Sequence, residues 1–218
     1  MSAGMNGTGD LVLDHVSYQP GPLLLDDVSV TFAAGRVTAL SGPSGSGKTT
    51  LLSIAGGLVA PSTGAATYDG RATWQGDGDP PPEIAFVLQV YGLVPILSAR
   101  ENVAIALRAR GTSWTDASDR AEAALARFDI ADLGDRQVEE LSGGQLQRVA
   151  CARGLVVGAP GLLADEPTSE LDQGNVGVVL DALRAEAERG CVVVIATHDP
   201  AIVELADHHV AIDEGRIA

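Results

Sequence analysis

Basic residues, cysteines and long apolar runs are scarce in this chain of 218 residues. Lysine and arginine together number 14 against 29 aspartates and glutamates, which leaves a formal net charge of −15. Broad contact with nucleic acid or with an anionic membrane surface needs a basic patch, so this charge argues against both. No stretch approaches the roughly 20 uninterrupted apolar residues that a membrane-spanning helix needs. We therefore expect a globular protein that does not bind nucleic acid.

The two cysteines and the first ten residues exclude further classes of protein. Cys151 and Cys191 lack the spacing of a metal or redox motif, and both stand among apolar residues. Small buried hydrophobic side chains are therefore their expected role. Residues 1–10 lack the basic start and the apolar middle of a secretory signal, and they are predicted to form a disordered tail. Together these features favour a cytoplasmic location.

The most informative segment is the glycine-rich run at residues 42–49. It lies between an apolar stretch at residues 36–40, which reads as a strand, and residues 50–55, which read as a helix. Three glycines let the backbone curl and direct its N–H groups inward, toward anionic oxygens. The helix that starts near Gly47 turns its positive end to the same place. Lys48 can then reach the β- and γ-phosphates of a nucleotide, and the Thr49 hydroxyl can ligate Mg²⁺. A chance match is disfavoured because the flanks agree with the motif. The predicted phosphate-binding residues are Gly42, Pro43, Ser44, Gly45, Ser46, Gly47, Lys48, Thr49 and Thr50.

Apolar stretches that alternate with helical periodicity predict a parallel sheet with helices. Strands are expected over residues 11–17, 28–32, 36–40, 64–69, 84–88, 162–164, 192–196 and 209–212. Helices are expected from the glycine-rich run to about residue 58, and over residues 99–110, 116–128, 145–157, 173–189 and 200–206. Helical character dominates the middle of the chain. We therefore predict a helical subdomain, over about residues 90–157, inserted into the α/β core.

Two carboxylates follow the apolar run at residues 162–164. An acid at the carboxyl end of a strand beside the glycine-rich loop can hold Mg²⁺ directly or through water, and Asp165 fits that role. Glu166 would then stand near the γ-phosphate, where a general base orients or deprotonates the attacking water. Taken alone, the pair is better explained as a strand end followed by solvated acids. Its interpretation therefore depends on a third motif.

That third motif, Leu141-Ser142-Gly143-Gly144-Gln145, places a hydroxyl and two glycines directly before a helix. It offers free N–H groups and a positive helix end to a phosphate, although a glycine turn with an ordinary N-cap is the alternative. One triphosphate does not need two anion-binding loops within one subunit. We therefore expect a head-to-tail pair of chains, with the nucleotide between the glycine-rich loop of one and the residues Ser142, Gly143, Gly144 and Gln145 of the other.

With these three motifs in this order, the chain resembles the ATP-binding cassette (ABC) ATPases, specifically the nucleotide-binding subunit of an ABC transporter. The resemblance extends from about Leu11 to Ile217. It implies a single α/β domain over residues 11–218, with a P-loop NTPase core built on a parallel sheet, an N-terminal antiparallel β-subdomain and an inserted helical subdomain. The run Gln145-Leu146-Gln147-Arg148 suits the lipoprotein-release and macrolide-export type.

The resemblance also implies roles for residues that carry little signal alone. Tyr18 falls where an aromatic ring stacks on adenine, with a surface strand tyrosine as the alternative. Gln89 falls where a glutamine ligates Mg²⁺ and senses the attacking water and the membrane partner. Ser169-Glu170-Leu171-Asp172 falls at a loop that crosses the dimer interface, with Glu170 where a small residue is usual. His198 falls where a histidine contacts the γ-phosphate, although a lone histidine after a strand is more often a cap or a surface residue.

By this resemblance, we expect the chain to bind ATP and Mg²⁺ and to hydrolyse ATP to ADP and phosphate. Closure of a homodimer, or of a pair with another ABC ATPase, would drive a separate membrane-spanning permease, and export is favoured. The permease would hold the chain peripherally at the inner face of the cell membrane. A soluble non-transport ABC ATPase and an import-type subunit are the alternatives, whereas the Ser-Gly-Gly-Gln loop argues against a small-molecule kinase. The expected catalytic residues are Glu166, His198, Lys48 and Gln89, and the expected metal-binding residues are Thr49, Gln89 and Asp165.

Overall fold

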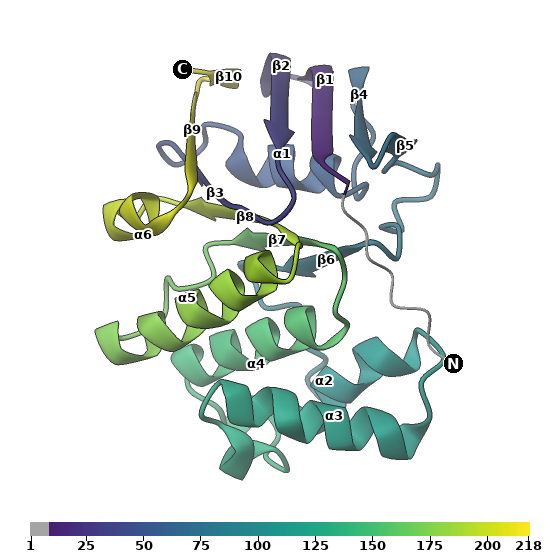
Figure 1. Cartoon of the computed structure of the whole chain (residues 1–218), viewed down its shortest axis with the longest axis vertical. Helices are drawn as coiled ribbons and strands as arrows, with labels where there is room; N and C mark the ends of the chain where they lie inside the picture. Colours follow the sequence, from purple (N-terminus) through teal and green to yellow (C-terminus); the bar gives the residue numbers. More distant parts are fainter. Residues whose placement is uncertain (1–8) are drawn as a thin grey trace. The chain divides into compact units, whose positions relative to one another are not determined.

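The computed structural model describes residues 9–218, which separate into two compact units (Figure 1). The first, called here the sheet unit, contains residues 9–86 with Ala159–Glu166 and Ala185–Ala218. The second, the helical unit, contains Val87–Gly158 and Pro167–Arg184. Most of the tail expected over residues 1–10 lies outside the described residues. Asp10, at its end, accepts a hydrogen bond from the amide of Ala34 at 2.9 Å.

Four strands of the sheet unit form an antiparallel sheet in the order β2-β1-β4-β5. Along β1, the side chains of Leu11, Leu13 and Val16 are buried, whereas Asp14 and His15 are exposed. A register irregularity between Leu13 and Val16 adds the extra residue that brings Val16 back to the buried face. The strands are β1 (Leu11–Tyr18), β2 (Leu25–Phe32), β4 (Thr63–Tyr68) and β5 (Arg71–Ala72).

A second sheet has six strands in the order β10-β9-β3-β8-β7-β6. Its central strands run parallel, with β3 between β9 and β8, and β7 on the other side of β8. The residues of β7 and β8 are buried throughout, which explains their uninterrupted apolar sequences. The strands are β3 (Val37–Ser41), β6 (Ile84–Val87), β7 (Gly161–Asp165), β8 (Val192–Thr197), β9 (His208–Asp213) and β10 (Arg216–Ile217).

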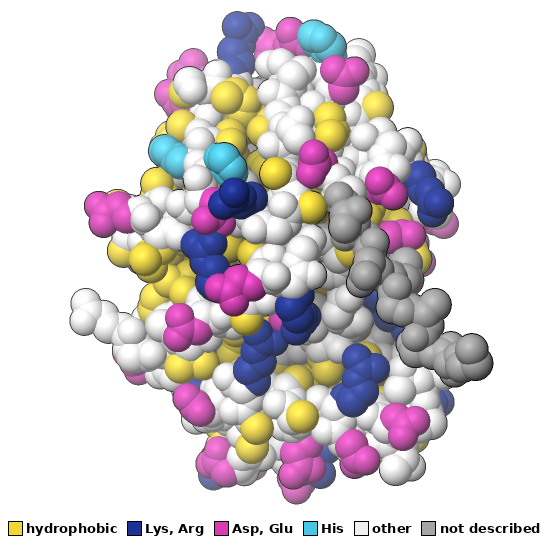
Figure 2. Space-filling view, in the orientation of Figure 1, with side chains coloured by type: hydrophobic (Ala, Val, Ile, Leu, Met, Phe, Trp, Pro, Cys, Tyr) yellow, Lys and Arg dark blue, Asp and Glu magenta, His cyan; other side chains and the backbone are white. Residues whose placement is uncertain are grey.

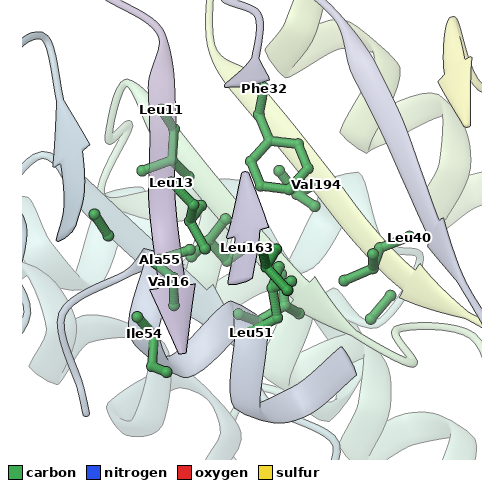
Figure 3. Close-up of a cluster of buried hydrophobic side chains, with 14 of the residues drawn as sticks. Leu11, Leu13, Val16, Phe32, Leu40, Leu51, Ile54, Ala55, Leu163 and Val194 are labelled. Atoms are coloured by element: carbon green, nitrogen blue, oxygen red, sulfur yellow. The ribbon is translucent and has the colours of Figure 1, made fainter. Parts of the chain in front are cut away.

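The core of the sheet unit joins both sheets through α1 (Lys48–Ala55). Figure 3 shows Leu51 and Ile54 of α1 among side chains from β1, β3, β7 and β8. Both residues are fully buried, and truncating such a side chain to alanine costs about 2–5 kcal/mol. Burial of this face therefore fixes the first turn of α1, which carries Lys48 and Thr49.

The helices of the helical unit begin where serine side chains cap them. Ser98, Ser113 and Ser142 accept hydrogen bonds from the amides three residues later, at the starts of α2, α3 and α4. The helix α5 begins in the helical unit and ends in the sheet unit, which also contains α6. The remaining helices are α2 (Ala99–Arg108), α3 (Trp114–Arg127), η1 (Ala131–Leu133), η2 (Val138–Glu140), α4 (Gly143–Val156), α5 (Gln173–Glu188) and α6 (Pro200–Leu205).

The expected α/β class, with a parallel sheet, an N-terminal antiparallel sheet and inserted helices, is confirmed. The helix after the glycine-rich loop is shorter than predicted because Gly56 and Gly57 follow Ala55, and Gly57 has a φ of 81°. The strand β2 begins at Leu25 rather than at Val28. The two-residue strands β5 and β10 were not predicted, since two residues carry no detectable periodicity.

The acidic character of the chain is visible on its surface. Figure 2 shows Asp and Glu side chains scattered among other residue types over the drawn face. Scattered carboxylates of this kind are typical of a solvated surface.

Candidate nucleotide site

The glycine-rich loop joins the end of β3 to the start of α1, and it is packed closely against the end of β9. A Cβ on Gly42 would lie 2.1 Å from the carbonyl oxygen of Ile212, so no side chain fits there. Gly47, directly before α1, has a φ of 107°. The amide of Gly215 donates to the carbonyl of Ser46 at 3.1 Å. The loop conformation thus depends on a strand that lies about 170 residues later in the chain, at 208–213.

Lys48, the only lysine in the chain, lies along the base of this loop. Its ammonium donates to the carbonyl oxygens of Gly42 and Pro43, at 2.7 and 3.0 Å, and the residue is buried. Two neutral carbonyls satisfy part of the donor capacity of an ammonium but leave its charge uncompensated. An anionic oxygen at the loop would supply that compensation.

The first turn of α1 is joined to the end of β7 by one hydrogen bond. Thr49 Oγ1 donates to Asp165 Oδ2 at 2.6 Å. Burial is the main cause that raises the pKa of the Asp165 carboxyl, and the charge of Glu166 raises it further. The hydrogen bond from Thr49 and the charge of Lys48 act in the opposite direction. This carboxylate would gain from a cation that neutralises it.

Glu166, which directly follows β7, and His198, which directly follows β8, form a second pair of side chains. Glu166 Oε1 lies 2.8 Å from His198 Nδ1, with the glutamate buried and the histidine ring largely exposed. The amide of Glu166 donates to the carbonyl of Ala196, and Glu166 has a φ of 48°. A left-handed conformation costs a non-glycine residue about 1–2 kcal/mol. Strain of this kind is frequently found at functional sites, and here it directs the carboxylate toward the ring.

The parallel sheet explains why these residues meet. Ser41 pairs with Thr197, and Asp165 pairs with Ala196, so β3, β7 and β8 end at one edge. The three strands lie side by side in Figure 1. Asp165 is the last residue of β7, and the glycine-rich loop, Glu166 and His198 directly follow the ends of β3, β7 and β8 respectively. Ligand sites of parallel α/β sheets lie at this carboxyl edge.

Tyr18 is linked to the glycine-rich loop through Leu24. The amide of Leu24 donates to the carbonyl of Tyr18 at 2.9 Å. The carbonyl oxygen of Leu24 in turn lies 3.1 Å from the point that a Cβ on Gly47 would occupy. Tyr18 is half-buried and packs against the core of the sheet unit. Its backbone is therefore positioned next to the loop, on the strand that precedes it.

Two observations fit an anionic group and a divalent cation at this edge. Ser46 Oγ is buried and makes no hydrogen bond within residues 9–218, which leaves a polar atom in the loop for a ligand. Thr49 and Asp165 offer oxygen ligands of the kind that Mg²⁺ takes. Across the described chain, no group of three or more His, Cys, Asp or Glu side chains could hold a metal ion. Thr49 and Asp165 are the residues that would hold a metal ion at this edge.

In the helical unit, Ser142 starts α4 with a reciprocal cap. The amide of Gln145 donates to Ser142 Oγ at 3.4 Å, and the amide of Ser142 donates to Gln145 Oε1 at 2.9 Å. The first amides of a helix, here those of Gly143 and Gly144, have no acceptor within the helix. The first turn of α4 contains no acidic residue. The anion-binding role that the sequence predicts for this helix end stays a prediction.

Gln89 is exposed and precedes a tight turn in which Tyr91 and Gly92 have φ values of 58° and 61°. Arg153 of α4 donates to the carbonyl oxygens of both Tyr91 and Gly92, at 2.5 Å each. Burial lowers the pKa of the Arg153 guanidinium. This contact fixes the segment after Gln89. Sequence reasoning missed it, since backbone carbonyls as partners leave no pattern in the residue types.

The segment that leads into α5 packs against the start of α4. Asp172 accepts hydrogen bonds from the backbone and side chain of Asn175, which hold the pKa of Asp172 below its usual value. Glu170 is exposed, and its Oε2 lies 3.1 Å from the point that a Cβ on Gly143 would occupy. Its carbonyl oxygen lies 3.0 Å from the corresponding point on Gly144.

The structure therefore brings together only part of the predicted set. Lys48 and Thr49 with the rest of the glycine-rich loop, Asp165, Glu166 and His198 share one edge of the sheet unit. Gln89 and the Ser142–Gln145 motif belong to the helical unit, where Arg153 binds the carbonyl of Tyr91 and Glu170 lies beside Gly143. Within residues 9–218, none of the helices has the length and apolar character needed to cross a bilayer.

Comparison with known proteins identifies the family. The sequence model described as ABC transporter matches residues 25–169. The uncharacterized ABC transporter ATP-binding protein Rv0073 of Mycobacterium tuberculosis is 41% identical over 209 residues, which cover 91% of this chain and 63% of that protein. The macrolide export ATP-binding/permease protein MacB of Burkholderia pseudomallei is 40% identical over 200 residues, covering 89% of this chain and 31% of MacB. The chain thus spans less than two thirds of these relatives.

Solved structures agree with the sequence relatives. The dimeric structure of MJ0796, described as a bacterial ABC transporter cassette, matches with a TM-score of 0.88 and 32% identity, covering 95% of this chain and 96% of that one. A dimeric post-hydrolysis state of MJ0796 bound to ADP and Pi matches equally well. The nucleotide-site residues described above lie in the same order as the family motifs that the sequence showed. The chain belongs to the family of ABC transporter ATP-binding proteins.

Proposed function

We propose that this chain hydrolyses ATP to ADP and phosphate at the carboxyl edge of β3, β7 and β8. The observation that carries the proposal is the convergence there of Lys48, the Thr49–Asp165 pair and the Glu166–His198 pair. Catalysis of phosphoryl transfer depends mainly on positioning and on charge stabilisation, and these side chains supply both. The ADP and Pi in the MJ0796 structure support the same reaction.

The phosphates are held by the glycine-rich loop in this proposal. Lys48 moves its ammonium from the carbonyls of Gly42 and Pro43 to the β- and γ-phosphate oxygens. The Ser46 hydroxyl and the loop amides complete the cradle. Tyr18, whose backbone carbonyl holds the Leu24 that lies beside Gly47, stacks on the adenine. The binding set continues with Ser44, Gly45 and Thr50.

Glu166 is the general base. Its carboxylate orients the attacking water and accepts its proton as the water oxygen bonds to the γ-phosphorus. The bond between the γ-phosphorus and the β,γ-bridging oxygen breaks, and ADP leaves with that oxygen. His198 holds the carboxylate at 2.8 Å and keeps it in register with the γ-phosphate. Thr49 and Asp165 would hold Mg²⁺, and by the family resemblance Gln89 would be a further ligand. The ion would supply neutralisation of the phosphate charge.

The site is completed by a second subunit. Ser142, Gly143, Gly144 and Gln145 of a partner present a capped helix end to the γ-phosphate, so that ATP joins two chains. The dimeric structures of MJ0796 support this arrangement. Either a second copy of this chain or another ABC ATPase can be the partner.

Closure of the dimer on ATP drives substrate movement by a separate membrane-spanning permease, with export as the proposed direction. Support comes from MacB, whose name joins an ATP-binding part and a permease in one protein. In the helical unit, Val90 and Ile96 are each 81% exposed, and they flank the segment after Gln89. Exposed apolar side chains of this kind mark interaction surfaces, so we assign them to the permease contact. The permease holds the chain at the inner face of the membrane.

The reaction is tested with Glu166→Gln, which keeps the size of the side chain but removes the base. We expect phosphate release to fall by roughly 100-fold or more while ATP binding persists, and ATP to trap a dimer. Glu122→Gln, an exposed acid on α3, is the matched control and should hydrolyse ATP as the unmodified chain does. A Glu166→Gln protein that releases phosphate at the normal rate would contradict the assignment of the base.

The partner is tested by affinity capture of tagged Glu166→Gln protein from detergent-solubilised native membranes, with and without ATP. Recovery of a multi-span membrane protein supports the transporter function, and its identity separates export from import. Recovery of soluble proteins alone, with the ATP-driven dimer intact, favours a non-transport ABC ATPase. Phosphate transfer to a small acceptor molecule would instead indicate a kinase.

A further inference from the structure

The Glu170 side chain occupies the space in front of α4. Its Oε2 lies 3.1 Å from the point that a Cβ on Gly143 would take, and the Tyr91 hydroxyl lies 3.7 Å from the same point. A carboxylate thus stands beside the first residue of a helix whose first amides have no acceptor within the helix. This is the helix end that the proposed function assigns to a γ-phosphate.

The charge at this place comes from the neighbouring loop rather than from the helix itself. The first turn of α4 contains no acidic residue, whereas Glu101 and Asp116 supply one in the first turns of α2 and α3. A negative charge near a helix N-terminus is stabilising. Glu170 therefore places beside α4 a carboxylate that the first turn of this helix lacks.

The backbone of Glu170 cannot move away easily, but its side chain can. The Glu170 carbonyl oxygen lies 3.0 Å and Leu171 Cδ2 lies 3.4 Å from the point that a Cβ on Gly144 would occupy. The amide of Leu171 donates to the carbonyl of Thr168, which fixes the turn. The Glu170 side chain is exposed, so rotation into solvent is open to it.

We propose that Glu170 is an inhibitory carboxylate, which stands beside Gly143 at the start of α4 and opposes the arrival of a γ-phosphate there. The proposal rests on the proposed function and adds a mode of regulation to that site. Two anions cannot share one helix end without repulsion, so the carboxylate must rotate away before two subunits close on ATP. The raised pKa of Tyr91, caused by burial and then by the charge of Glu170, is consistent with a carboxylate held close to this cluster.

The test compares Glu166→Gln with Glu166→Gln/Glu170→Gln, because both variants retain ATP in a dimer. The glutamine keeps the size of the side chain and removes only its charge. We expect the ATP concentration for half-maximal dimer, measured by sedimentation velocity, to fall by about tenfold in the double variant. The difference should shrink in 0.5 M salt, about three times physiological ionic strength, because salt screens exposed charges. Glu166→Gln/Glu122→Gln is the control and should leave the midpoint unchanged.

Stability without nucleotide provides a second readout. Glu170→Gln alone should lower the melting temperature of the nucleotide-free protein by about 1–3 °C, since the helix end loses its anion. A normal dimer with an unchanged ATP midpoint would overturn the inhibitory role alone. Relief of inhibition by Glu170→Ala but not by Glu170→Gln would also overturn it, since size and not charge would then oppose closure. Absence of an ATP-driven dimer in every variant would overturn this inference, whereas loss of phosphate release from the unmodified chain would overturn the proposed function.

Discussion

The sheet unit and the helical unit present their site residues in opposite ways. In the sheet unit, side chains are paired with one another across strand ends, as Thr49 is with Asp165 and Glu166 with His198. In the helical unit, the side chains bind backbone groups instead of one another. Arg153 holds two carbonyls, and Ser142 caps the helix end that Glu170 faces.

This difference suggests a division of roles, with the chemical step in the sheet unit and recognition of an arriving anion in the helical unit. Paired acids, a hydroxyl and a buried ammonium can bind phosphate and act on water within one chain. A capped helix end and an exposed glutamine supply dipoles and donors, which act only when an anion arrives. We therefore expect changes in the sheet unit to alter ligand binding and chemistry, and changes in the helical unit to alter closure.

The largest effect is expected from Ser142→Arg. A long cationic side chain at the start of α4 blocks a γ-phosphate sterically, so turnover should fall by roughly 100-fold or more. Binding of a fluorescent ATP analogue to the monomer should be unchanged, because the sheet unit is intact. Ser113→Arg is the matched control, since it removes the same type of cap from α3 and should cost a similar stability, about 1 kcal/mol. Equal turnover in the two variants would remove α4 from the site.

An intermediate effect is expected from Arg153→Lys. Lysine keeps the charge but lacks the planar fork that reaches the carbonyls of Tyr91 and Gly92 together. We expect kcat to fall by about tenfold with little change in monomer ATP affinity, because the segment after Gln89 loses its position. Arg120→Lys, which affects a single contact to the Val156 carbonyl, is the control. A rise in KM with normal kcat would argue for a role in binding instead.

The smallest effect is expected on stability, from Asp165→Asn in the absence of nucleotide. The folded protein raises the pKa of Asp165 above its ordinary value of 3.8, chiefly by burial, so protonation favours the folded state. That contribution is fully present below the ordinary value and is lost as the pH rises through the folded-state pKa. The variant should therefore melt about 2–5 °C above the unmodified chain at pH 7.

The advantage of Asp165→Asn should decrease as the pH approaches 4, and the variant should lose Mg²⁺-dependent ATP hydrolysis. Thermal melts at both pH values and phosphate release measure the two effects. A melting temperature at pH 7 equal to or below that of the unmodified chain would show that the buried carboxylate imposes no cost on the fold.

Local residue patterns predicted most of the architecture. The strand 192–196 and the helix 173–189 were predicted within one residue of β8 and α5, since long periodic segments carry a strong signal. The end of α1 was placed too late, and the two-residue strands were missed. The roles predicted for Gln89 and Tyr18 came from family resemblance, whereas that of the Ser142–Gln145 motif came from its residue types, and all three remain predictions for the experiments above.

The sequence by itself determined the phosphate-binding loop, the paired acids and the order of motifs, because each depends on residue types at fixed local spacing. Only the tertiary structure decided the partners: Asp165 for Thr49, His198 for Glu166, the carbonyls of Tyr91 and Gly92 for Arg153, and the start of α4 for Glu170. The physical reason is that a parallel sheet brings the ends of distant strands to one edge, and backbone carbonyls bind side chains without leaving a mark in the sequence.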